Sequence, residues 1–472
     1  MRLRTSLQHS FALDVRVFPR RLGKADCKDM DVSVFALLLL CLSGQTLTVL
    51  GTTEPPVTLP SVPDNTSLVH EAEQEGDCQT RQFSQEAKRA VGAAIMKLGL
   101  HLLEKLQTSP EQPNVIMSPL SISLALSQLA LGAKNETEAL LLAALHAQDM
   151  PCYHWILHKT VQHLGVHALK VASRMYLKPD FELKQAFVEE SRRIYSSEPK
   201  PLLGLEEINQ WVENATHGQI TKFLSSLPSN VVLMLVNVVH FKGEWQARFD
   251  PRFTSRDLFY IDSKDTVYVD MMQGPKYPLS ILVDNDMGIQ VASFAFKEGM
   301  SFMVVMPIAD DVNVSAIVPR LDPSDLYDRL PRVTNMQVKL PKIKLEYSQD
   351  LTDSLTLMGL GQLFSTPDLS GIADGFLTVS SLQHKSSMEL HEEGAEAAAS
   401  TAVIVSRSNP TFTVNQPFFF AIMDDTTRTP LFLGVITNPN PGASSATQSD
   451  HPSNVTFPFN KESSEVLLSP PK

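Results

Sequence analysis

Cysteine is scarce in this chain, and so are the patterns that mark common enzymes. Its 472 residues include four cysteines, no Cys-X-X-Cys pair and no Gly-X-Ser-X-Gly turn. Thirteen histidines are scattered without metal-ligand spacing. The run His391-Glu392-Glu393 opens like a zinc-protease motif, but Ala395 stands where the second histidine ligand is needed. The sequence therefore predicts that the protein binds no metal or cofactor and is not an enzyme. The alternative is a hydrolase whose site is assembled from Ser, His and Asp residues that lie far apart in the sequence.

Long hydrophobic runs and dense basic clusters are missing as well. The formal net charge is -12, and no dense Lys/Arg cluster follows the first residues, which argues against a nucleic-acid partner. The apolar run 32–42 has about eleven residues, too few for a membrane span of about twenty. A basic run precedes it and small residues follow it, as in a signal peptide, while the alternative is a buried core helix. We expect residues 1–44 to be a leader, with Met30 as an alternative start, and no membrane partner.

The remaining cysteines and the glycosylation motifs also indicate secretion. Cys27 and Cys41 fall in the leader, which leaves Cys78 and Cys152 as an even pair. If they bond, the closed loop of about 74 residues would contribute up to ~4 kcal/mol and tie the N-terminal extension to the body. Asn-X-Ser/Thr motifs suit the same compartment. They lie at Asn65, Asn135, Asn214, Asn313 and Asn454.

Composition divides the rest of the chain into three zones. Residues 45–84 are rich in Pro, Thr, Ser and Glu, and residues 442–472 are rich in Ser and Pro. Both zones predict flexible extensions, because neither carries enough apolar side chains to form a core. Residues 85–441 show the apolar periodicity of a folded body.

Two helices are expected near the start of this body. Apolar residues recur at spacings of three and four from Val91 to Leu106, as on one face of an amphipathic helix. Ser118 suits the N-cap of a second helix, Pro119 its first residue and Gly132 its stop. That second helix is apolar nearly all round, so it should be buried.

The remainder of the body mixes strands and helices. The apolar run 231–241 has no 3.6-residue period and many β-branched residues, which predicts a strand covered on both faces. Further strands are expected at 301–308, 335–347 and 416–425, and helical patches at 205–218 and 351–361.

Several long stretches, spread over the whole body, together resemble the serpin family. They include LVNVVHFKGEWQARFD and QPFFFAIMDDTTRTPLFLGVITNPNP, and they run in the family's order. The six stretches are 114–137, 208–220, 235–250, 340–365, 382–401 and 416–441. The resemblance implies an α+β fold, the serpin fold, with three β-sheets, about nine helices and an exposed reactive loop.

In the serpin family, the reactive loop is bait for a serine protease. The protease cleaves the loop as a substrate, and the loop then enters the central sheet as an extra strand while the protease is still acyl-linked. The segment from Gly394 to Arg407 fits that task, because it holds no proline and its small residues avoid burying bulky or charged side chains. The resemblance assigns the hinge of this loop to Glu392, Gly394, Ala395, Glu396, Ala397, Ala398 and Ala399.

Arg407 is the expected bait residue. A trypsin-like protease carries an Asp in its specificity pocket, and a guanidinium group matches that carboxylate bidentately. Counting from the hinge as in most serpins places the cut after Ser408, one residue later. The chain resembles members whose loop is one residue shorter. We therefore predict cleavage of the Arg407–Ser408 bond. The expected targets are plasmin and other trypsin-like proteases in blood plasma, in the control of fibrinolysis. The alternative is a non-inhibitory serpin that acts as a carrier or precursor.

The resemblance also carries over single positions at the central sheet. One group matches a polar cluster under the sheet where strands part, and consists of Ser118, Ser121, Asn237 and His384. Glu392 and Lys342 match an ion pair where the loop enters the sheet, and Trp245 lies at the same opening.

Resemblance to plasmin-inhibiting serpins implies two further partners. A lysine-binding kringle module of plasmin or plasminogen recognises a cation and an anion held apart. Lys472 at the C-terminus would supply both charges, and Lys461 is the other lysine after residue 441. The alternative is a plain disordered tail. Fibrin attachment would need a transglutaminase-reactive Gln near the mature N-terminus, for which Gln45 and Gln74 are candidates. We expect a monomer.

Overall fold

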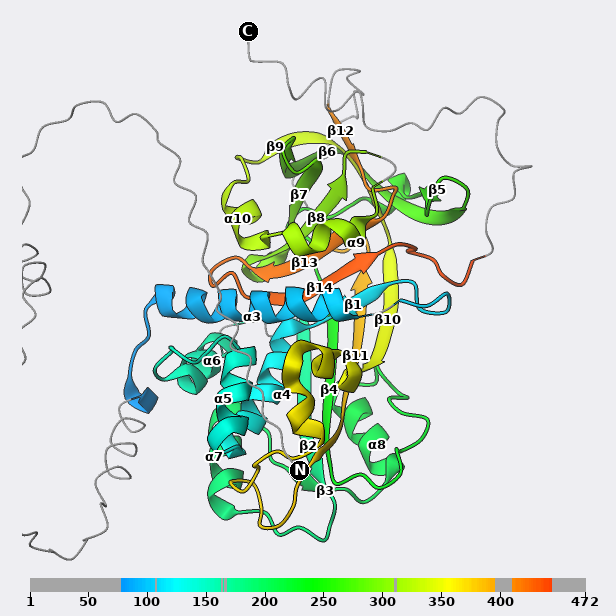
Figure 1. Ribbon diagram of the computed structural model, residues 1–472. Helices are drawn as coiled ribbons and strands as arrows, with labels where there is room; N and C mark the ends of the chain where they lie inside the picture. The colour runs from blue at the N-terminus through cyan, green and yellow to red at the C-terminus, as the bar shows by residue number, and fades with distance from the viewer. Residues whose placement is uncertain are drawn as a thin grey trace, which may run out of the picture. The chain divides into compact units, whose positions relative to one another are not determined.

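The computed structural model describes residues 78–443, apart from 107, 163, 165–167, 310–311 and 395–409 (Figure 1). Predictions about the leader and the two extensions therefore stay predictions. Within the described part, no helix combines the length and apolar character needed to cross a membrane.

The first sheet has five strands, in the order β10, β11, β4, β2, β3. Their bounds are Ile343–Asp350, Val379–Leu390, Leu233–Lys242, Leu169–Leu177 and Lys200–Pro201. Every residue of β4 except the last is buried. Helix α8 (Leu205–Ala215) covers one face, where its Ile208 and Val212 cluster with Val236 and Val238. Helix α4 (Pro119–Gly132) lies against the other face. The strand expected at 231–241, covered on both faces, is confirmed.

The second sheet has nine strands, which divide into two halves that share β6 (Thr266–Asp284). One half continues from β6 through β7, β8, β13 and β14 to β1, and the other joins β6 to β5, β9 and β12. Together with the five-stranded sheet, the two halves correspond to the three sheets expected. The bounds of these strands are Val115–Met117 for β1, Ser255–Tyr260 for β5, Ile289–Ala295 for β7, Met300–Pro307 for β8, Thr334–Pro341 for β9, Thr411–Thr413 for β12, Phe418–Asp424 for β13 and Pro430–Ile436 for β14.

The described part of the chain contains nine α-helices, α3 to α11. Besides α4 and α8 they are α3 Gln85–Lys105, α5 Asn135–Ala144, α6 Tyr153–Val161, α7 Gln185–Tyr195, α9 Val314–Ile317, α10 Pro323–Asp328 and α11 Thr352–Leu355. Helix α3 lies alongside β14 (Figure 1). The helices predicted at 91–106 and 205–218 are confirmed as α3 and α8. The patch at 351–361 is also helical, although only its first turn is α-helix before π and 3₁₀ turns take over.

Helix α4 begins and ends at the predicted residues. The Ser118 side chain caps it by accepting a hydrogen bond from the backbone N–H of Ser121. Gly132 is the last helical residue and not a left-handed stop, because the C-cap is Ala133. A Cβ atom at Gly132 would overlap the side chain of Ile372. The helix therefore stops at Gly132, as predicted, but the glycine serves close packing there and not a left-handed turn.

The strand expected at 335–347 is two strands that belong to different sheets. Strand β9 ends at Pro341 and β10 begins at Ile343. Between them, the backbone N–H of Lys342 donates to the carbonyl of Asp270 at 2.8 Å. Periodicity alone does not reveal the break, because both strands keep the two-residue alternation. The break places Lys342 at the junction of the two sheets.

Candidate functional site

The candidate site begins where β11 ends. The described chain continues beyond Leu390 to Gly394, and it resumes at Pro410, just before β12 in the other sheet. The predicted reactive loop therefore joins the two sheets, and most of it lies outside the described residues. The predicted positions that fall outside are Ala395, Glu396, Ala397, Ala398, Ala399, Arg407, Ser408, Asn65, Asn454, Lys461, Lys472, Gln45 and Gln74.

Strands β4 and β11 meet along a parallel seam. Pairing runs from Val379 with Leu233 to Glu389 with Lys242. The outer neighbours, β10 and β2, are antiparallel to β11 and β4 respectively. A chain that turned back after β11 and ran along the seam would be antiparallel to both of its neighbours. It would replace one parallel ladder with two antiparallel ladders, which are slightly more stable per residue.

Four buried polar side chains lie under this seam. Asn237 on β4 and His384 on β11 are partners in the register. The Oδ1 atom of Asn237 lies 2.8 Å from Nδ1 of His384 and accepts the Ser121 hydroxyl at 2.7 Å. The Nδ2 atom of Asn237 donates to the Ser121 carbonyl at 2.6 Å, and the Ser118 backbone N–H donates to Nε2 of His384 at 3.4 Å. The cluster therefore links both strands of the seam to α4.

His384 makes these contacts as a neutral ring. Burial lowers its pKa to about 3. A neutral imidazole carries one N–H group, and the contacts fit a proton on Nδ1, pointing at Asn237, with Nε2 accepting from Ser118. A second proton on Nε2 would face the Ser118 N–H and break this contact. The contact between β11 and the start of α4 thus depends on the charge of one histidine.

An ion pair stands at the loop end of the seam. The Oε2 atom of Glu392 lies 3.0 Å from Nζ of Lys342, and its Oε1 atom accepts the Thr254 hydroxyl at 2.7 Å. Partial burial opposes ionisation, but the hydrogen bonds from Thr254 and Lys342 outweigh it and hold the pKa of Glu392 below its ordinary value. Sequence reasoning missed Thr254, which lies 138 residues from Glu392 and has no local pattern to reveal it.

Trp245 closes the same end of the seam. It is fully buried, stacks on Phe296 at a ring-centroid distance of 4.4 Å, and donates its indole N–H to the His391 carbonyl at 2.6 Å. Its backbone pairs with Gly394 in a parallel bridge, and its N–H donates to the Glu393 carbonyl at 3.0 Å. A Cβ atom at Gly394 would overlap the Trp245 carbonyl. The first residue of the loop must therefore be a glycine to pass this close.

His391 and Glu393 pair with each other. Nε2 of His391 lies 2.7 Å from Oε2 of Glu393, which also lies 3.6 Å from Nζ of Lys242. Among the described residues, no group of three or more His, Cys, Asp or Glu side chains is arranged to hold a metal ion. The sequence shows at these positions only an incomplete zinc-protease motif, and it does not reveal this pairing beside the hinge.

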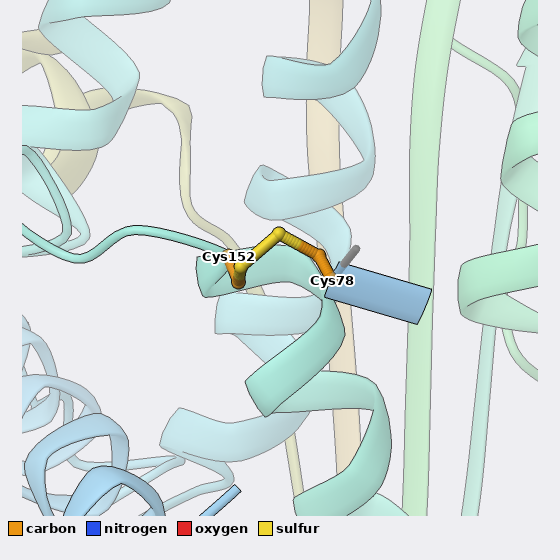
Figure 2. Close-up of a disulfide and its surroundings, with 2 residues drawn as sticks. All are labelled: Cys78 and Cys152. Carbon is orange, nitrogen blue, oxygen red and sulfur yellow. A yellow bond between two sulfur atoms is a disulfide. The ribbon is translucent and has the colours of Figure 1, made fainter. Parts of the chain in front are cut away.

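Cys78 and Cys152 form a disulfide, as Figure 2 shows. Their Cα atoms are 5.4 Å apart, and 74 positions separate them in the sequence. Cys152 is the N-cap residue of α6, and Cys78 packs with Trp155 and Ile194. The bond therefore fastens the residues before α3 to the α6–α7 side of the body.

Three of the five glycosylation motifs lie in the described part. Asn135, Asn214 and Asn313 are all exposed. Asn135 begins α5 and donates to Oδ2 of Asp368 at 2.7 Å, whereas Asn313 caps α9. Exposure makes each a sterically open position, and glycosylation at any of them stays a prediction.

Comparison with known proteins accords with this geometry. A family model described as "Serpin (serine protease inhibitor)" matches residues 93–439. The chain is 43% identical to alpha-2-antiplasmin from Bos taurus over 78% of its length and 76% of that protein, and the Mus musculus protein matches at the same identity and shares. It is 31% identical to Homo sapiens pigment epithelium-derived factor, over 80% of this chain and 92% of that protein.

Solved structures agree with the sequence relatives. Mouse protein-Z dependent protease inhibitor superposes with a TM-score of 0.67 at 26% identity, covering 76% of this chain and all of the other. Human glycosylated kallistatin gives the same TM-score at 25% identity, covering 75% of this chain and 99% of the other. Because the family model spans most of the described body and the sequence relatives exceed 30% identity over comparable lengths, the chain belongs to the serpin family.

Proposed function

We propose that the protein is a secreted inhibitor of trypsin-like serine proteases, with plasmin as its main target. The 43% identity to two alpha-2-antiplasmins supports this target. The inhibitor acts as a suicide substrate. The protease serine attacks the carbonyl carbon of Arg407, the Arg407–Ser408 peptide bond breaks, and the new amine at Ser408 leaves with a proton. The Arg407 side remains an ester of the protease.

The parallel seam is the observation that carries this mechanism. The loop follows β11 directly, and it can reach the seam by turning back at Gly394, where the backbone already pairs with Trp245. Insertion adds a strand that is antiparallel to both neighbours. About a dozen net hydrogen bonds at ~1 kcal/mol each give on the order of 10 kcal/mol. That free energy is comparable to the stability of a whole domain, so it can displace a tethered protease.

The loop sequence suits both the exposed loop before cleavage and the inserted strand after cleavage. Residues 394–407 contain no proline, so each can donate to a ladder. The small residues Ala397, Ala398 and Ala399 enter first and bury no bulky group. Arg407 offers a planar guanidinium to the acidic pocket of a trypsin-like protease. Cleavage after Arg407 and not after Ser408 is part of the proposal.

A denaturing gel tests the proposal directly. After the protein is mixed with plasmin, we expect a covalent complex that resists denaturation, and Arg407→Ala should abolish it. Ser408→Ala serves as the control, since it leaves the bait residue in place and should still form the complex. Mass spectrometry of the released C-terminal fragment locates the cut: a fragment that begins at Ser408 supports the proposal. Cleavage without a complex would show a substrate or non-inhibitory serpin instead.

The extensions have a proposed supporting role. The tail 442–472 carries Lys461 and Lys472, whose side-chain ammonium groups match the cation site of a lysine-binding kringle of plasmin. Gln45 or Gln74 would serve transglutaminase coupling to fibrin. Truncation before Lys472 should slow complex formation with intact plasmin but not with its isolated protease domain. Equal slowing with both would refute kringle docking.

A further inference from the structure

A second ion pair stands at the mouth of the seam, the end where Lys242 on β4 faces Glu389 on β11. The Nζ atom of Lys242 lies 3.6 Å from Oε2 of Glu393, which follows β11. The first ion pair, between Glu392 and Lys342, is placed differently, because Lys342 directly precedes β10 and β10 lies on the far side of β11 from β4. The Lys242–Glu393 pair therefore joins the two sides of the seam, whereas the Glu392–Lys342 pair does not.

His391 fixes the direction of the Glu393 side chain. The Nε2 atom of His391 lies 2.7 Å from the same Oε2 atom that faces Lys242. The His391 side chain is 15% exposed and that of Glu393 is 65% exposed, so a largely buried ring orients an exposed carboxylate. The hydrogen bond from His391 is the main reason that the pKa of Glu393 lies below its ordinary value, and the charge of Lys242 adds to it. Glu393 therefore presents a negative charge to Lys242.

Insertion of the loop has to pull this ion pair apart. Neighbouring strands lie about 4.8 Å apart, so a strand that enters between β4 and β11 moves them to about 9.6 Å. Lys242 moves with β4, while Glu393 stays with the chain that continues β11. A backbone movement of this size separates the two charges. The hydrogen bond from the Trp245 backbone N–H to the Glu393 carbonyl has to open in the same step.

We propose that Lys242 and Glu393 are positioning residues for the trapping reaction, and that their ion pair holds the mouth of the seam closed until the loop is cleaved. The inference rests on the proposed function, because it concerns the opening step of loop insertion. Ion pairs between exposed side chains add little to the stability of a fold, so the effect lies in the rate at which the seam opens. Loss of the pair should speed insertion about two- to fivefold.

A synthetic peptide with the sequence of residues 394–407 measures the opening of the seam without any protease. The peptide supplies the extra strand, and its uptake by the full chain is followed as a rise in melting temperature with incubation time. Lys242→Met and Glu393→Gln should each take up the peptide about two- to fivefold faster than the wild type. Equal rates in all three proteins would refute the role of the ion pair alone. No uptake by the wild type would overturn the proposed function, and this inference with it.

A double-mutant cycle shows whether the two residues act as a pair. The Lys242→Met/Glu393→Gln variant should be no faster than the faster single variant, because both changes remove one interaction; rates that multiply would refute the pairing. Lys242→Arg keeps the charge and should keep the wild-type rate. Lys344→Met is a matched control, because Lys344 faces Glu389 from β10, on the side of β11 away from the seam. Equal acceleration by Lys344→Met would mean a general charge effect and contradict the proposal.

Melting temperatures measured before the peptide is added separate opening of the seam from loosening of the fold. The Lys242 side chain is 45% exposed and that of Glu393 is 65% exposed. Substitutions at such positions change stability little, so each variant should melt within about 2 °C of the wild type. Faster uptake accompanied by a melting temperature more than about 5 °C lower would show a general loss of stability and overturn the assignment to the mouth of the seam.

Discussion

At the residue scale, the charge of one buried histidine decides whether β11 keeps its contact with α4 under the seam. His384 joins β11 to β4 through Asn237 and to α4 through Ser118, and only its neutral form satisfies both contacts. Its ordinary pKa of 6.5 falls to about 3 on burial. Between these pH values, His384 binds a proton in the unfolded chain but not in the folded protein. The free energy of unfolding therefore falls as the pH drops from about 6.5 toward about 3.

His384→Gln should flatten this pH dependence. The free energy of unfolding should depend less steeply on pH, by up to about 1.4 kcal/mol per pH unit, because one titrating site is removed. Urea unfolding at several pH values between about 7 and about 5 measures the slope. His217→Gln changes an exposed histidine on the same body and should leave the slope as it is. Identical slopes for wild type and His384→Gln would contradict the proposed role of burial.

At the element scale, the loop must be able to act as a strand. Proline lacks the backbone N–H that a central strand donates to its ladder, so Ala398→Pro should block insertion. The bait residue is unchanged, and plasmin should still cleave the loop at a similar rate. We expect cleaved chain without covalent complex on a denaturing gel. Ala398→Ser keeps the donor and a small side chain, and it should still trap the protease. A stable complex with Ala398→Pro would show that insertion does not depend on this ladder.

The elements also show what a sequence can and cannot reveal. The buried strand at 231–241 and the Ser118 cap are predictable because each leaves a local signature in residue type and spacing. The break at Lys342 is not, because both flanking strands keep the same alternation while they belong to different sheets. Thr254 was missed for a related reason, since its contact with Glu392 depends on how distant segments pack. The polar cluster could be named from the family resemblance alone, but its hydrogen bonds required the three-dimensional arrangement.

At the scale of the whole molecule, the disulfide ties the N-terminal segment to the body. Replacing both Cys78 and Cys152 with serine should lower the free energy of unfolding by up to ~4 kcal/mol, because the loop of 74 residues is no longer closed. Thermal unfolding of the double variant with and without reductant measures the change. Reductant should destabilise the wild type and have no effect on the variant. Equal stability of the wild type and the double variant without reductant would show that the disulfide adds nothing to the stability of the native state.

Cleavage of the loop should stabilise the whole molecule, which is unusual for a cut chain. A nick in an ordinary surface loop adds no contacts, whereas here it frees a strand for the seam between β4 and β11. Insertion worth on the order of 10 kcal/mol should raise the melting temperature of the nicked protein by roughly 10–20 °C. Calorimetry of the chain before and after limited trypsin treatment measures the shift, with the cut confirmed after Arg407. The Ala398→Pro variant, nicked at the same bond, should gain little or nothing. A nicked wild-type protein that melts at or below its intact form would exclude insertion, whatever complexes form on a gel.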